Sequence, residues 1–235
     1  GKGTMSRLTE KLKRLSKGTT TPLGFQPHTT PQEPPLLLIP ILGPGKAAPD
    51  VAGAVLVEST GKPQEQLTPP TGDAPWGVSI DTLGVQKASR LKESGCDFVV
   101  LTSLESPAEA LDSGMGKLLM VNPDLADSHI RALGSLVDAA ALDLQSSALS
   151  IRCLMDCHRL SGLLGRPLLA WVSPELSGEE VGRLAEAGVR GIISRASKAR
   201  LQQWHKALLS RPVSRISSPL ELPTPSLPPS PPQGG

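Results

Sequence analysis

Eight short apolar runs recur along the chain between residues 36 and 194. Each run has the length of a strand and is apolar on both faces, which is typical of buried strands in a parallel sheet. The runs span residues 36–42, 52–58, 76–81, 97–101, 117–121, 139–144, 167–173 and 188–194. The pattern therefore predicts eight parallel strands.

Helical patterns separate most of these runs. They span residues 82–95, 106–114, 122–136, 146–165 and 173–188, and a last one starts at Lys198. Ser173 followed by Pro174 predicts a helix start, and Gly188 predicts a helix end. The connections after the first and second runs are too short or too rich in proline to form a good helix.

Strands that alternate with helices predict an α/β fold, and eight such strands predict a (β/α)8 barrel of the TIM type. Residues 36–208 must supply all eight units, whereas a typical barrel uses about 250 residues. We therefore expect a compact barrel that is trimmed in its first quarter. The alternative is an open, doubly wound parallel sheet in which one or two of the early strands are absent.

Composition divides the chain into four segments. Residues 1–18 form a basic amphipathic arm, and residues 19–35 form a linker rich in proline and threonine. Residues 36–210 form a single barrel-like domain. Residues 211–235 are rich in proline and serine and cannot build a core, so they are predicted to be a disordered tail.

The arm has the pattern of a short amphipathic helix. Its apolar positions share one helical face, and basic residues fill most of the rest: Met5, Leu8, Leu12 and Leu15 are the apolar ones. Such a helix lies on an anionic membrane surface, docks to a protein partner or touches nucleic acid. Otherwise it folds back onto the base of the barrel or stays a solvated tail. The sequence leaves these alternatives open.

Composition also limits the classes of partner. The chain has three Trp, two Phe and no Tyr, so nucleic-acid binding through stacked aromatic side chains is not expected. Its three cysteines do not form a disulfide framework in a chain of this length, which indicates reduced thiols and a cytoplasmic location. No apolar run approaches the roughly 20 residues of a transmembrane segment.

Two stretches, KASRLKESGCDFVVL and LSGEEVGRLAEAGVRGIIS, share the order of helix, glycine turn and apolar strand. Over about residues 76–208 the chain resembles the phosphate-binding branch of the aldolase-type (β/α)8 barrel superfamily, and this resemblance implies the barrel fold. The chain departs from that branch after its last strand, where residues 194–197 read Ser-Arg-Ala-Ser instead of a Gly-Ser or Gly-Thr turn. It also lacks a strand-end Lys for a Schiff base, so a Lys-based aldolase is disfavoured.

In a barrel, the residues at the carboxyl ends of the strands converge on one face. Glu58, Asp81 and Asp143 lie at or near the ends of otherwise apolar runs. We expect these carboxylates to be catalytic and to bind a divalent metal such as Mg²⁺, which prefers oxygen ligands. The alternative is structural: the carboxylates cap the following helices and pair with Arg195 or Lys87.

Four more polar residues follow the predicted strands and are expected to bind substrate: Arg195, Ser194, Ser173 and Asn122. Arg195 is the cation of this set, and a guanidinium can hold an anionic group through two hydrogen bonds. The whole set predicts an acidic ring with one cation at the strand ends.

A second cluster, Cys153, Cys157 and His158, has the residue types of a metal site. On a helix the two cysteines share a face, whereas the histidine points about 100° away from Cys157. Zinc sites usually combine a C-x2-C pair with a second ligand pair, and none is present here. The pattern favours buried thiols over a metal centre.

Two functions fit the sequence. The first is a metal-assisted lyase, isomerase or aldolase-type enzyme, or a small-molecule binder, that uses the acidic ring. The second is a non-catalytic, degenerate barrel that acts as a scaffold or sensor through its basic arm and proline-rich tail. Whether the protein is an enzyme stays open at this point.

Overall fold

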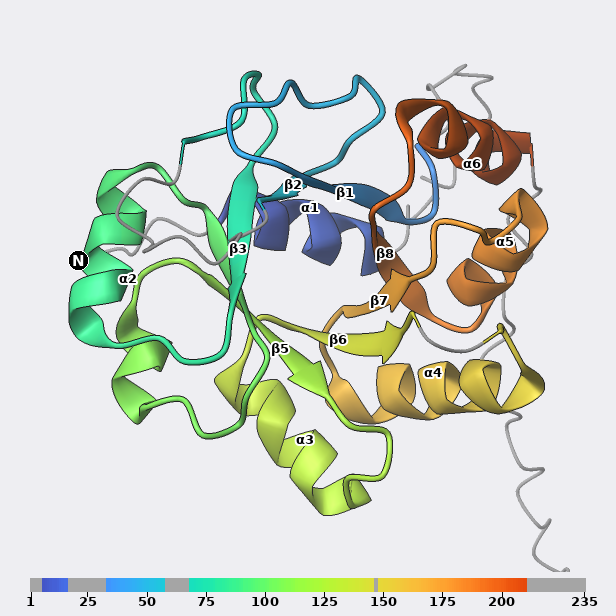
Figure 1. Ribbon diagram of the computed structural model, residues 1–235. Coiled ribbons are helices and arrows are strands. Elements are labelled where there is room, and N and C mark those ends of the chain that lie inside the picture. Colours follow the sequence, from blue (N-terminus) through green and yellow to red (C-terminus); the bar gives the residue numbers. More distant parts are fainter. Residues whose placement is uncertain (1–5, 17–32, 58–67, 146–147, 211–235) are drawn as a thin grey trace, which may run out of the picture.

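The computed structural model describes residues 6–16, 33–57, 68–145 and 148–210. Eight parallel strands pair in chain order, and the last pairs with the first, so the sheet closes into a barrel (Figure 1). The strands are β1 (Leu37–Leu42), β2 (Val55–Val57), β3 (Trp76–Ile80), β4 (Phe98–Leu101), β5 (Gly116–Val121), β6 (Ala139–Leu144), β7 (Leu168–Val172) and β8 (Val189–Ser194). The (β/α)8 barrel prediction is confirmed, and the pairing of β1 with β8 rules out the open sheet.

Helices surround the barrel between the later strands (Figure 1). They are α2 (Val85–Glu93), a short 3-10 helix η2 (Ala108–Asp112), α3 (Asp127–Leu136), α4 (Ile151–Leu164), α5 (Gly178–Glu186) and α6 (Lys198–Ser210). Residues 43–54, which connect β1 to β2, contain no helix. The barrel is therefore trimmed at its first connection, as its length predicts.

One predicted helix start is wrong. Helix α5 begins at Gly178 and not at Pro174, because Ser177 is its N-cap. The Ser177 hydroxyl accepts a hydrogen bond from the Glu180 amide at 3.2 Å, and the Glu180 carboxylate accepts one from the Ser177 amide at 2.8 Å. This reciprocal capping box satisfies two amides that the first helical turn leaves unpaired. The predicted stop is confirmed, since Gly188 adopts a φ of 97° that disfavours other residues.

Side-chain alternation along the strands creates two apolar layers. The outer layer packs the barrel against its helices. The inner layer fills the barrel and is smaller: Leu8, Leu12, Ile39, Ala54, Leu56, Phe98, Val100, Leu118, Ala139, Ala141, Leu169, Trp171 and Ile193. Two of its members, Leu8 and Leu12, belong to no strand.

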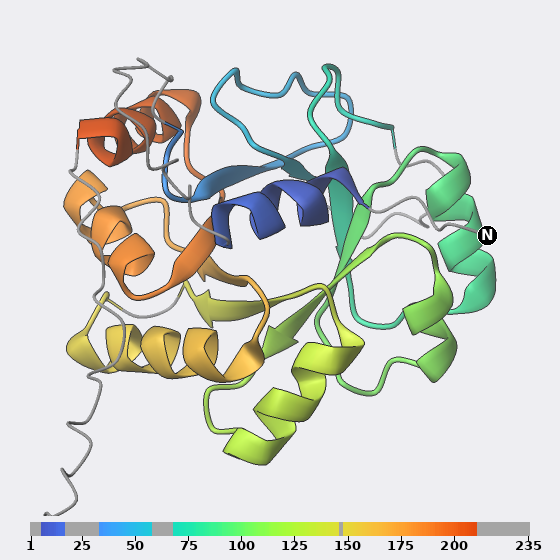
Figure 2. The ribbon, with the colours of Figure 1, turned by 180° about the vertical axis from the view of Figure 1, so that it is seen from behind.

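These two leucines come from helix α1 (Arg7–Ser16), which lies across the amino-terminal end of the barrel, here called its base (Figure 2). Both side chains are fully buried in the inner layer. Of the alternatives for the basic arm, the structure has the helix folded back onto the barrel. Its apolar stripe therefore seals the base, and its basic residues lie around that seal.

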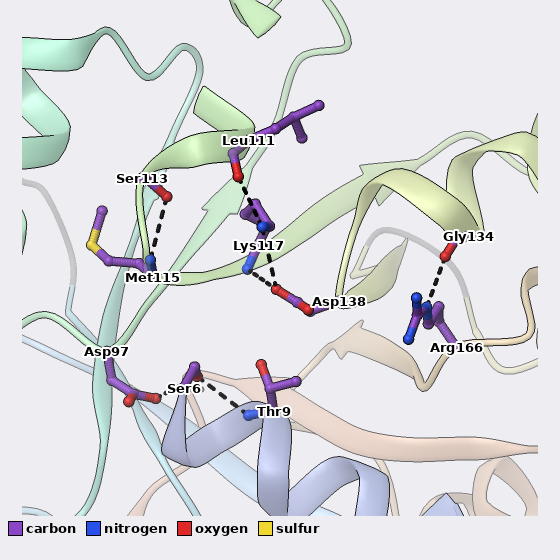
Figure 3. Close-up of polar contacts among 10 residues, drawn as sticks. All are labelled: Ser6, Thr9, Asp97, Leu111, Ser113, Met115, Lys117, Gly134, Asp138 and Arg166. Carbon is purple, nitrogen blue, oxygen red and sulfur yellow. Dashed lines mark hydrogen bonds and ion pairs between the residues drawn. The ribbon is translucent and has the colours of Figure 1, made fainter. Parts of the chain in front are cut away.

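Asp97, directly before β4, fixes the start of α1. Its carboxylate accepts a hydrogen bond from the Ser6 hydroxyl at 2.7 Å (Figure 3). It also accepts hydrogen bonds from the backbone amides of Arg7 and Leu8 at 2.8 and 2.9 Å. A negative charge at a helix amino terminus is also favoured by the helix dipole. Gly116 makes room for this contact, because a Cβ there would lie 2.6 Å from the Ser6 hydroxyl.

The remaining predictions on domain organisation fall mostly outside the described residues. This holds for the tail at residues 211–235, for most of the linker at residues 19–35, and for Met5 of the apolar stripe. Residues 33–36 enter β1 directly.

Replacing Leu12 with Ala tests the role of α1. Removing a fully buried leucine leaves a cavity and should lower the free energy of unfolding by about 2–5 kcal/mol. Leu136→Ala is the matched control, because Leu136 is 52 % exposed on α3; it should change stability by less than about 0.5 kcal/mol. Urea unfolding followed by circular dichroism measures both. Equal effects of the two substitutions would contradict a core role for α1.

Candidate active site at the barrel mouth

The carboxyl ends of the strands form the opposite end of the barrel, here called its mouth. Along β6, Ala139 and Ala141 point into the inner layer, whereas Ala140 and Leu142 point into the outer layer. By the same alternation Asp143 faces inward. It is exposed to solvent, so its carboxylate lies at the mouth and not in the core.

Asp143 is held in place by its own turn. One carboxylate oxygen accepts hydrogen bonds from the Gln145 backbone amide at 3.0 Å and from the Gln145 side-chain amide at 3.3 Å. Within the described parts of the chain, no cation pairs with it. The carboxylate therefore keeps acceptor capacity for a molecule at the mouth.

Trp171 is the register partner of Asp143 on β7 and also faces inward. Its side chain is only 9 % exposed, and its indole N–H is buried without a hydrogen-bond partner among the described residues. Trp204, by contrast, donates its indole N–H to the Leu176 carbonyl at 2.8 Å. A buried unpaired donor costs about 1–3 kcal/mol. The indole N–H of Trp171 is such a donor, and it lies on the strand next to the Asp143 carboxylate.

Asp81 follows β3 and is engaged by its neighbours. Its carboxylate accepts a hydrogen bond from the Thr102 hydroxyl, and its backbone carbonyl accepts one from the Ser106 hydroxyl at 3.2 Å. Burial lowers the pKa of Lys87, and the Asp81 charge partly offsets that shift. Asp81 does not cap α2, because that helix begins at Val85 after Gly84. It ties the loops after β3 and β4 together.

Ser194 ends β8 and is fully buried. Its predecessor Ile193 packs in the inner layer and Ile192 in the outer layer. Alternation therefore turns Ser194 outward, away from the barrel interior. Its hydroxyl has no partner among the described residues. Arg195, one position later, is exposed.

The other two polar residues of the predicted ring organise loops. The Ser173 hydroxyl accepts a hydrogen bond from the Glu175 amide at 3.2 Å, and the Asn122 side chain accepts one from the Asp124 amide at 2.9 Å. Such bonds two residues onward form compact turns. Glu58, the third predicted carboxylate, lies outside the described residues.

The described residues contain no group of three His, Cys, Asp or Glu side chains that could hold a metal ion. Of the cysteine cluster, Cys157 is buried in the outer layer, whereas His158 on α4 is exposed. Sequence reasoning missed Trp171, because an inward tryptophan looks like ordinary core. The available signal was strand alternation, which places Trp171 on the inward face of β7, in register with Asp143 on β6.

Comparisons with known proteins support the fold. No protein-family profile matches the chain, and no match was found among curated proteins. Solved structures do match it. A tryptophan synthase from M. tuberculosis, in an open form with a bound compound, is 14 % identical over 87 % of this chain and 97 % of that one, with a TM-score of 0.57.

A mutant tryptophan synthase alpha-subunit from Pyrococcus furiosus is 14 % identical over 73 % of this chain and 96 % of that one, with a TM-score of 0.55. A protein from Aquifex aeolicus is 11 % identical, over 86 % of this chain and 95 % of that one, with a TM-score of 0.54. At such identities the likeness establishes a shared (β/α)8 barrel fold. Among the described residues, no helix is long and apolar enough to cross a membrane.

The thiols provide a test of the described packing. Burial raises the pKa of both Cys96 and Cys157 to about 12, so less than about one part in a thousand of either is thiolate at pH 8. Cys153 is only half-buried. A thiol-reactive dye should therefore label Cys153 rapidly in the folded protein, and all three cysteines after denaturation. Labelling of Cys157 before Cys153 would contradict this packing.

Proposed function

We propose that the protein is a small-molecule enzyme or binder of the lyase, isomerase or aldolase type that works at the barrel mouth. The observation that carries the proposal is the pairing of Asp143 with Trp171. An inward carboxylate with spare acceptor capacity lies in register with an indole donor that lacks a partner. Active sites of characterised (β/α)8 enzymes lie at this end of the barrel.

In this proposal Asp143 transfers a proton to or from the bound molecule, and Trp171 packs against it and offers one donor. A carboxylate can act as a general base when the reacting proton is within hydrogen-bond reach. Arg195, exposed after β8, would attract an anionic group of the substrate. Ser173 and Asn122 would keep the rim loops in shape around the ligand.

A more specific version of this proposal adds a divalent metal ion at the mouth. It would require Asp81 and Asp143 to provide carboxylate oxygens to Mg²⁺, with Glu58 as the further predicted ligand. Asp81 already accepts the Thr102 hydroxyl, which favours a loop-organising role for it. We therefore assign proton transfer to Asp143 without requiring a metal.

The scaffold alternative is weakened by the position of α1. That alternative uses the basic arm and the proline-rich tail as contact surfaces. The tail lies outside the described residues, and the apolar stripe of the helix is buried inside the barrel through Leu8 and Leu12. A partner would have to bind the basic face alone, and exposed charges by themselves contribute little affinity.

Thermal unfolding with added ligands tests the proposed site. The panel contains Mg²⁺, Mn²⁺, flavin mononucleotide, sugar phosphates and small hydroxy and keto acids. A compound at 100 times its dissociation constant should stabilise the fold by about 2.7 kcal/mol. Asp143→Asn should weaken the binding of that compound at least about tenfold, and Trp171→Phe should weaken it to a smaller degree.

Asp124→Asn is the matched control, because Asp124 is an exposed acid in a rim loop; this substitution should leave binding unchanged. A response to Mg²⁺ that Asp143→Asn removes would support the metal-assisted form. No response to any compound, or responses that Asp143→Asn leaves intact, would refute the assignment of the site.

A further inference from the structure

A cavity of about 400 Å³ lies at the base of the barrel, at the other end from Asp143. Its walls come from α1, from the chain that enters β1, from the connection between β1 and β2, and from His205 on α6. Figure 2 shows α1 crossing this end of the barrel beside β1 and the helix-free connection. Residues 50–53 of that connection form one of the cavity walls.

The floor of the cavity is aliphatic. Leu36 and Leu38 are buried beneath it, and Val51 and Ala52 of the connection are partly buried at its side. Such a surface favours a branched aliphatic group, because each CH₂ group removed from water contributes about 0.8 kcal/mol.

Charges of opposite sign line the cavity from different walls. Lys11 and Arg14 come from α1, whereas Glu33 precedes β1 and Asp50 lies in the β1–β2 connection. No ion pair joins these cations to these acids in the described structure. The Lys11 ammonium instead donates to the Gly53 carbonyl at 2.8 Å. Both signs of charge are therefore available to a bound molecule.

The environment of Lys11 favours an anionic group beside it. Burial and the neighbouring Arg7 charge lower the pKa of its ammonium, and the Asp97 carboxylate offsets only part of this shift. A ligand carboxylate near Lys11 and Arg14 would supply the missing negative charge. An ammonium near Glu33 and Asp50 would complete the complementarity on the other side.

We propose that this basal cavity binds a small zwitterion with an aliphatic side chain, such as a branched-chain amino acid. Its carboxylate contacts Lys11 and Arg14, its ammonium contacts Asp50 or Glu33, and its side chain rests on Leu36 and Leu38. Because the charges lie near the rim, the dissociation constant is expected in the millimolar range.

This site has a direct effect on the seal of the barrel. A bound zwitterion connects α1 to the β1–β2 connection, so it stabilises the docked position of α1 and with it the inner core. Binding therefore favours the folded protein by mass action. The basal cavity would act as an effector site that is separate from the mouth.

Isothermal titration calorimetry with three matched probes tests this proposal. L-Leucine carries both charges, 4-methylpentanoate carries only the carboxylate, and 3-methylbutylamine carries only the ammonium. Leucine should bind about two- to fivefold more tightly than either single-charge analogue, because each exposed charge at the rim contributes modestly. Ala52→Leu, which fills the cavity, should abolish binding. Arg14→Met should weaken the binding of leucine and of the acid, and Asp50→Asn that of leucine and of the amine.

Lys206→Met is the matched control. Lys206 neighbours His205 on α6 but does not line the cavity, so removing its charge should leave binding unchanged. Asp143→Asn should also leave leucine binding unchanged, which separates this site from the mouth. No leucine binding at about 10 mM would overturn the proposal. Equal affinity for leucine and 4-methylpentanoate would overturn the zwitterion assignment, and binding that survives Ala52→Leu would overturn the location.

Discussion

The carboxylate of Asp97 connects the first helix to the rest of the molecule. It accepts the Ser6 hydroxyl and the first two helical amides, so α1 can begin only where the loop before β4 places that charge. From this fixed start the helix delivers Leu8 and Leu12 into the barrel. The seal of the base, the shape of the inner core and one wall of the basal cavity all depend on this contact.

Much of the barrel could be predicted because its strands are continuous apolar runs. The observed strands agree with the predicted runs within a few residues. Parallel strands that are buried on both faces are apolar along their whole length, so the apolar run itself marks where each strand begins and ends. The helix start at Ser177 was missed, although a serine three residues before a glutamate is present in the sequence. The prediction placed the start at Ser173 and Pro174 instead, because proline also suits the first turn of a helix.

The position of α1 and the geometry of the site could not be predicted in the same way. The Asp97 contact joins residues 90 positions apart, and nothing local marks it. At the strand ends, one residue of register decides whether a side chain faces the mouth or the helices. Asp143 and Ser194 both lie at or next to the end of an apolar run, but Asp143 faces inward whereas Ser194 is buried on the outer side.

The place of α1 in the core also affects the order of folding. The partners of α1 in the inner layer extend as far as Ile193 on β8. The leucines of α1 can therefore be fully buried only after the last strand of the barrel is in place. Contacts of such sequence separation slow folding, because the intervening chain must be ordered first. During synthesis, an early-made basic helix would thus remain undocked until nearly the whole barrel has emerged, and the base would close last.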